Sequence, residues 1–415
     1  MVQGVNLLKQ KLLFLCFFLV SKAYSLPFVD EFVLKSPEVD EAKLEIEKLE
    51  NQVKQVRGSL FPQVTWSNSQ TRIKNITAFT GSATLYASKL EITQPIYTGG
   101  KLFAALDLAK EELKIAKLNL KMTTEASKLK AFNFLLQVRN QQEKIKIAKD
   151  QLEIQKKNRS IIQRKSKLGN AKSYELPQAE ADFIARKVQL EQLEIEYEKL
   201  DKEVTSYVSN WREMTKNKWE PKQDIQSIDV QNLFQNNFEL QALNLQMKNL
   251  KLNQKIDLGE DNPSIAISAS EGYQATESSG LFDESNRSSQ IVLSASLPLF
   301  SGLSSIYKKR AHSKSIAILE RQIQEKKRIV ALHYEQMQEE LNQKKTLLKS
   351  YERWKSFAKK SLLEAQKSYR IGRINFLQLS QVQQSLDNAE SSYWDTWYDF
   401  HSKRLKMLNL QGQVL

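Results

Sequence analysis

Histidine is the residue type here that would most readily supply a catalytic base or a metal ligand, and the chain contains only three. A metalloprotease zinc site needs two histidines four residues apart, with a glutamate directly after the first. His333 is followed by Glu335 rather than by a neighbouring glutamate, and Met337 stands where the second histidine is needed. His312 and His401 are isolated in the sequence. We predict no catalytic residue and no metal site, and we interpret the histidines as ordinary helix-face residues.

The segment Tyr97–Lys101 superficially resembles a phosphate-binding loop, because two glycines precede a lysine. That motif also needs an earlier glycine, where this chain has Pro95, and a serine or threonine after the lysine, where it has Leu102. We therefore expect no bound nucleotide and no other cofactor. The chain is not expected to be an enzyme, and energy for any transport would come from a partner protein.

The first residues predict a secretory signal peptide. Lys9 and Lys11 precede an apolar run over residues 12–20, and the small residues of Ala23–Ser25 follow, which predicts cleavage after Ser25. The run is too short to span a bilayer as a helix, which takes about 20 residues. Cys16 is the only cysteine, so the mature chain is expected to contain no disulfide.

Composition favours long helices. Only 12 of the 415 residues are glycine and 8 are proline, whereas lysine, glutamate, glutamine and leucine are abundant. The net charge of +14 would fit a nucleic-acid partner, but the charge is spread along helices and the chain carries an export signal, so we predict no such partner. No later stretch approaches 18 consecutive apolar residues, so a membrane location would require β-strands.

The chain contains an internal duplication. Pro95–Gly99 recurs as Pro298–Gly302, and Gly169 recurs as Gly372, both at an offset of 203 residues. Two separated motifs with one offset indicate a duplicated structural unit. We predict a signal peptide at residues 1–25, a first repeat at 26–210, a linker at 211–232 and a second repeat at 233–415.

Each repeat is predicted to run helix, strand, strand, long helical hairpin. The first helices span residues 38–57 and 234–258. Strands with period-two alternation are predicted at residues 264–274 and 290–300, with counterparts around 64–67 and 86–93, and each second strand is expected to end at Pro95 or Pro298.

Long helices follow at residues 101–168 and 303–371, each about 100 Å long at 1.5 Å per residue. Gly169 and Gly372 are predicted to end them in a left-handed conformation. Ser173 or Asn375 would cap the return helices, which run to about residues 210 and 407.

Four strands are too few to close a barrel, and an open sheet edge is not tolerated in lipid. The apolar stripes of the hairpins also need partners. Both features predict a ring of identical subunits.

The motifs Gln94–Gly99, Leu297–Gly302 and Tyr369–Gly372, in this duplicated order, resemble the TolC-like outer membrane efflux proteins over nearly all of the mature chain. The resemblance implies an α+β, mainly α fold, in which helical hairpins form a periplasmic α-barrel and four strands per chain join a 12-stranded outer-membrane barrel. It also implies a homotrimer, a periplasmic adaptor, an inner-membrane pump or ABC exporter, and passive conduction of substrates to the exterior.

The resemblance further suggests functional positions. The family has acidic residues at the tunnel entrance of the second repeat, where this chain has Gln378 and Gln381, and the first-repeat equivalents are Glu175 and Gln178. An alternative interpretation makes these four residues ordinary polar groups of helix N-termini. The adaptor is expected to dock on residues 168–174 and 370–376. The remaining candidates are the docking tips and the strand-to-helix junctions: Leu168, Gly169, Ile371, Gly372, Pro95, Gly99, Pro298 and Gly302.

Two further hypotheses stay open at the level of sequence. The duct could serve small-molecule efflux or type I protein secretion, and the chain could instead be a periplasmic coiled-coil scaffold without a pore. The alternating strands argue against a scaffold, which needs no sheet.

Overall fold

The computed structural model describes residues 27–73, 83–215 and 228–412. The predicted signal peptide and the centre of the predicted linker, residues 216–227, lie outside the described residues. The described chain divides into two compact units. We call Glu41–Lys121 with Phe238–Arg328 the sheet unit, and Met1–Asp40 with Met122–Asn237 and Ile329–Leu415 the tip unit. Each unit combines corresponding parts of both repeats.

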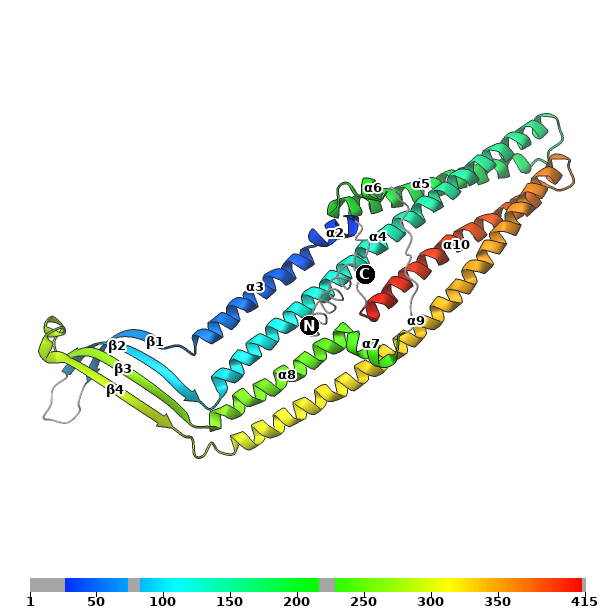
Figure 1. Cartoon of the computed structure of the whole chain (residues 1–415). Coiled ribbons are helices and arrows are strands. Elements are labelled where there is room, and N and C mark those ends of the chain that lie inside the picture. Colours follow the sequence, from blue (N-terminus) through cyan, green and yellow to red (C-terminus); the bar gives the residue numbers. More distant parts are fainter. Residues whose placement is uncertain (1–26, 74–82, 216–227, 413–415) are drawn as a thin grey trace, which may run out of the picture. The chain divides into compact units, whose positions relative to one another are not determined.

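The sheet unit contains four antiparallel strands in the order β1-β2-β3-β4 (Figure 1). This confirms the prediction of two strands in each repeat. The seam between the repeats is the pairing of β2 with β3, and β1 and β4 form the two edges within the chain. The strands are β1 (Gln63–Ile73), β2 (Ala83–Thr98), β3 (Ser264–Ala275) and β4 (Arg287–Ser296).

The two faces of this sheet differ in polarity. One cross-strand row consists of Val64, Ile92, Ala269 and Ile291, and the adjacent row, on the other face, consists of Thr65, Glu91, Ser270 and Gln290. Successive side chains of a strand point to opposite faces, so at these rows the sheet has apolar groups on one face and polar groups on the other. The apolar face is uncovered in the single chain, where Ile291 is 78% exposed.

The prediction that the second strand of each repeat ends at its proline is wrong. β2 continues through Pro95 to Thr98, because a bulge between Pro95 and Tyr97 accommodates a residue that has no amide hydrogen to donate. β4 already ends at Ser296, two residues before Pro298. Both junctions nevertheless turn at a glycine in the left-handed region, Gly99 at φ +67° and Gly302 at φ +65°.

The long helices are confirmed as predicted, within one residue at each end. They are α4 (Lys101–Lys167) and α9 (Ser304–Arg370), each 67 residues long. Their bounds differ by 203 residues at both ends, the offset of the sequence motifs. The return helices are α5 (Glu175–Tyr207) and α10 (Phe376–Leu410).

The predicted helix at residues 234–258 is in fact two helices, α7 (Val230–Asn236) and α8 (Phe238–Leu258), separated by Asn237. Asn237 has an extended backbone, and its side chain donates a hydrogen bond to the Leu410 carbonyl at 3.2 Å. The first repeat contains the same break, between α2 (Pro27–Leu34) and α3 (Pro37–Gly58). The predicted linker contributes the short helix α6 (Trp211–Met214) and the start of α7.

The tip unit is held by separate apolar cores. The first joins α2, α4, α5 and α6, where Phe32 stacks on Tyr207 with ring centroids 4.4 Å apart and Trp211 is 1% exposed. Another joins α7, α9 and α10 around Leu233, Tyr334 and Met407. None of the helices in the described ranges has the length and apolarity needed to cross a bilayer.

Candidate functional site

The two hairpin turns of the tip unit have the same backbone geometry. Gly169 has φ +73° and Gly372 has φ +76°. The amide of Asn170 donates to the Lys165 carbonyl at 2.9 Å, and the amide of Arg373 donates to the Ser368 carbonyl at 2.9 Å. The amides of Gly169 and Gly372 donate to the carbonyls of Ser166 and Tyr369, three residues earlier, at 3.0 and 3.1 Å. The two bonds at each turn form a Schellman motif, which satisfies the last carbonyls of the helix. The predicted role of both glycines as helix stops is confirmed.

The return helices restart differently. Asn375 caps α10 in a capping box, accepting from the Gln378 amide at 2.9 Å while the Gln378 side chain accepts from the Asn375 amide at 3.0 Å. The prediction for Asn375 is thus confirmed. Ser173 does not cap α5, because the chain turns through Lys172–Glu175 and puts Tyr174 at the cap position without a side-chain bond. The two tips therefore share the backbone turn that ends the long helix and differ in how the return helix is capped.

An apolar cluster, here called the tip core, packs the hairpins against each other behind the turns. All four of its helices contribute buried side chains. Tyr369 and Phe376, on either side of the second turn, are each 2% exposed, and Lys165 of the other hairpin lies 4.1 Å from the Tyr369 ring centroid. The tip core consists of Ile162, Ala179, Ala358, Leu362, Ala365, Tyr369, Phe376, Leu379 and Leu386.

The candidate docking residues protrude from this core. Leu168 is 74% exposed and Ile371 is 64% exposed, at equivalent positions of the two repeats. Tyr174 and Leu377 add further exposed apolar surface beside them. Each turn thus presents an apolar side chain next to its glycine.

The four candidate entrance residues do not share one environment. Gln178 and Gln381 are both exposed, and the Gln178 side chain donates to Asp182 at 2.8 Å. Glu175 is only 6% exposed and lies close enough to Tyr369 to influence its ionisation. Burial, assisted by the negative charge of Glu175, raises the pKa of Tyr369 to about 12. Gln378 is part of the capping box described above.

A buried ion pair links the hairpins and was not predicted from the sequence. Arg186 of α5 contacts Asp387 of α10, and it also donates to the Gln151 side chain of α4 at 3.2 Å. Burial raises the pKa of Asp387 to about 6, although Arg186 acts in the opposite direction. The desolvation of this carboxylate therefore outweighs the attraction of its partner.

Buried amides form a second polar link beside the first. Gln155 and Asn158 of α4 both donate to the side-chain oxygen of Gln383 on α10, at 3.4 and 3.3 Å. Nearby, burial raises the pKa of Glu390, and Lys355 and Lys359 oppose that rise. A network of this kind fixes the register of two helices more than it adds stability.

The junction candidates Pro95, Gly99, Pro298 and Gly302 lie in the sheet unit, and the packing there is close at Gly99. The carbonyl of Gly99 accepts from the Asn262 side chain at 3.1 Å, and a Cβ on Gly99 would lie 2.2 Å from the Gly259 carbonyl oxygen. This close approach requires glycine. Among the described residues, no group of three or more histidine, cysteine or acidic side chains is arranged to hold a metal ion.

The chain thus joins a four-stranded sheet to two long helical hairpins, with one strand pair and one hairpin in each repeat. The chain belongs to the outer membrane efflux protein family, whose model matches residues 29–205 and 230–413, one segment in each repeat. It is accordingly an outer-membrane protein that extends into the periplasm. Members of this family are channels of tripartite efflux systems and work as trimers with an adaptor and a pump.

Solved structures share the fold at low sequence identity. The outer membrane protein VceC from Vibrio cholerae has a TM-score of 0.78 at 16% identity, with 93% of this chain and 95% of that chain covered. The CmeC outer membrane channel of Campylobacter jejuni has a TM-score of 0.79 at 16% identity, covering 93% and 85%. The open state of the MtrE outer membrane channel of Neisseria gonorrhoeae has a TM-score of 0.79 at 13% identity, covering 94% and 89%. No curated protein sequence matches this chain.

Proposed function

We propose that this chain is one subunit of a trimeric exit duct, through which small molecules supplied by an inner-membrane pump and its adaptor leave the cell passively. The sheet carries this proposal. It has one apolar and one polar face, as the wall between lipid and an aqueous lumen requires, and its edges β1 and β4 are unpaired within the chain. Pairing β4 of one copy with β1 of the next would remove both edges.

The tips of the hairpins are the proposed inner end of the duct. Gln178, Gln378 and Gln381 are the entrance candidates that a solute could meet, since all three are exposed, and Gln178 and Gln381 occupy equivalent positions of the two repeats. Glu175 is buried against the second hairpin in the single chain, so it would contribute a carboxylate to the entrance only after the tips separate. An opening movement would thus change the charge of the entrance as well as its width.

Adaptor docking is assigned to the turns themselves. Leu168 and Ile371 provide apolar side chains exposed to solvent, and Gly169 and Gly372 keep the neighbouring backbone uncovered. Apolar anchors flanked by accessible backbone suit the end of a helical hairpin from a partner.

Planar-bilayer recording tests the duct directly. Purified protein should insert to give uniform conductance steps, and the same protein run on a size column should elute as a trimer. Absence of discrete steps from folded trimers would contradict the proposal.

The cargo is tested separately in cells. Deleting the gene should raise dye accumulation and leave the set of secreted proteins unchanged, and the wild-type gene should restore efflux. Loss of one secreted protein with normal dye efflux would favour type I protein secretion instead.

A further inference from the structure

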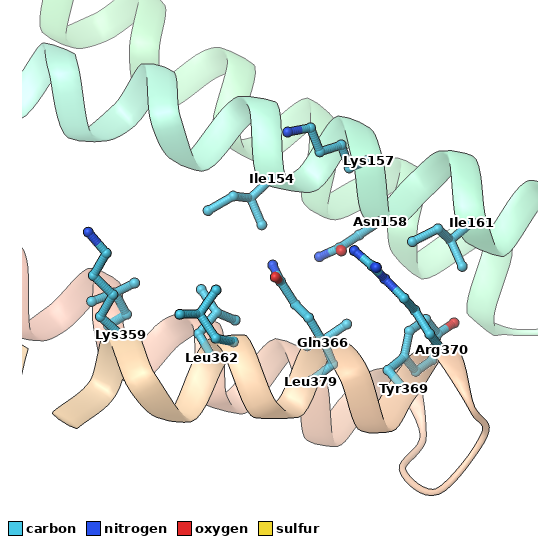
Figure 2. A pocket seen from close by; sticks show the side chains of 12 residues that line it. Ile154, Lys157, Asn158, Ile161, Lys359, Leu362, Gln366, Tyr369, Arg370 and Leu379 are labelled. Carbon is cyan, nitrogen blue, oxygen red and sulfur yellow. The ribbon is translucent and has the colours of Figure 1, made fainter. Parts of the chain in front are cut away.

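A cavity of about 300 Å³ lies between the hairpins in the tip unit, and Arg370, the first residue of the docking segment 370–376, is part of its lining. Figure 2 shows α4 along one side and α9 along the other, with their side chains facing each other across the space. The volume is at the lower end of the roughly 300–1,000 Å³ typical of small-molecule sites.

The floor of the cavity is apolar and belongs to the tip core. Leu362 is 4% exposed and Leu379 is 1% exposed, and Ile154 and Ile161 of α4 pack against the same core. The only polar group buried in this floor without a hydrogen bond among the described residues is the Tyr369 hydroxyl. The floor therefore suits an aliphatic or aromatic body rather than a sugar or a phosphate.

The rim is cationic. Lys157 comes from α4, and Lys359 and Arg370 come from α9, from which they extend toward the space in Figure 2. All three side chains are exposed, and within the described part of the chain none of them forms an ion pair or donates a side-chain hydrogen bond. No aspartate or glutamate lines the cavity, and Glu390 is the nearby carboxylate that Lys359 influences.

We propose that this cavity binds a freely diffusing, single-chain amphiphile with a carboxylate headgroup. The apolar body would lie on the floor and the carboxylate would bind Arg370 or one of the lysines. A two-chain bilayer lipid exceeds the volume. A partner helix about 10 Å across also does not fit, because two turns of it would occupy roughly 850 Å³. Since α4 and α9 belong to different hairpins, the ligand bridges them and favours the arrangement in which they are packed together.

Calorimetric titration of decanoate tests the site on the full chain reconstituted in lipid nanodiscs, with empty nanodiscs as the blank. Saturable binding of one decanoate per chain is expected. One of the variants Arg370→Gln, Lys359→Gln and Lys157→Gln, the one that removes the cation bound to the carboxylate, should weaken it about tenfold, the effect of losing one charge-assisted hydrogen bond. Arg353→Gln is the matched control, because Arg353 is an exposed cation of the same helix outside the lining and should leave binding unchanged.

Decyltrimethylammonium, which has the same chain and the opposite charge, should show no saturable binding. Circular dichroism confirms that each variant folds, which is expected since the substituted side chains are exposed. Equal binding of the cationic amphiphile, wild-type affinity in all three lining variants, or no binding beyond the blank would overturn the proposal. Conductance is not measured, so none of these outcomes bears on the proposed duct.

Discussion

Replacing Asp387 by asparagine should stabilise the tip unit at neutral pH, although it removes one partner of an ion pair. Asp387 is 8% exposed, and burial raises its pKa from 3.8 to about 6 even with Arg186 beside it. The folded chain therefore prefers the neutral carboxyl. Asparagine reproduces that neutral group at nearly the same size and can still accept from Arg186.

The magnitude follows from the shift in pKa. Each pH unit corresponds to about 1.4 kcal/mol, so a rise from 3.8 to about 6 amounts to about 3 kcal/mol. The raised pKa means that the folded state holds the proton more tightly than the unfolded state. The extra stability that the folded state gains by binding this proton is complete below about pH 4 and is lost as the pH rises through about 6. At pH 7 the wild type has lost this stabilisation, so the asparagine variant should be more stable than the wild type by most of the roughly 3 kcal/mol.

Hydrogen exchange with peptide-level mass analysis provides the measurement. Opening free energies in α10 around residues 383–390 should fall between pH 4 and pH 7 in the wild type, after correction for intrinsic exchange. In Asp387→Asn this fall should be smaller, and in the double variant Asp387→Asn with Glu390→Gln the opening free energies should be nearly constant over that range. Glu390→Gln is needed alongside, because burial raises the pKa of Glu390 as well and adds its own pH dependence.

The control is Asp395→Asn, which removes an exposed aspartate of the same helix that pairs with Lys144 at 2.5 Å. It should change local stability by less than about 1 kcal/mol. Destabilisation of α10 by 3–5 kcal/mol in Asp387→Asn would instead mean that the pair with Arg186 outweighs desolvation, and the argument above would be wrong.

Three further outcomes are expected. Gly372→Ala should destabilise its turn by about 1 kcal/mol, and the cause would be the positive φ alone, because a Cβ there meets no atom within 4 Å. Export assays should then show impaired efflux with trimers intact, and normal efflux would mean that this glycine is dispensable. Gly99→Ala should prevent stable trimers, since its Cβ would collide with the Gly259 carbonyl. Gly100 has φ +84° and no atom within 4 Å of an added Cβ, so Gly100→Ala should cost only about 1 kcal/mol in thermal melts. Equal effects of the two substitutions would refute the packing argument. Reversal potentials in a salt gradient should show a near-neutral or anion-selective channel if part of the positive excess lines the lumen, and strong cation selectivity would point to carboxylates there.

The duplication and the long hairpins are predictable from sequence because their boundaries are marked by residues with few alternatives. Gly169 and Gly372 have positive φ values, which other residues adopt only with strain, and the same holds for Gly99 and Gly302. Period two and period 3.6 then identify the elements between these markers. The strand ends were predicted less well, since Pro95 marks a bulge as readily as a terminus.

The links between the hairpins were not predictable in the same way. Arg186 and Asp387 occupy unrelated positions in the two repeats, where Ala389 and Ile184 are the equivalent residues. Neither internal comparison nor helical spacing connects them, because their contact depends on how two helices are rotated about their axes. The break at Asn237 was missed for a similar reason, since the bond that stabilises it reaches Leu410 at the far end of the chain.

The repeats agree in length and turn geometry and differ in side chains, and this has a consequence for symmetry. A ring of three chains would contain six long helical hairpins of equal length but would have only threefold symmetry at its tips, because each chain supplies one tip with a capping box and one without. A partner that binds to the end of this ring contacts capped and uncapped tips alternately, and these are two inequivalent binding sites. A partner with threefold symmetry can then be held in one rotational setting rather than two, so the uncapped and capped tips together fix its orientation.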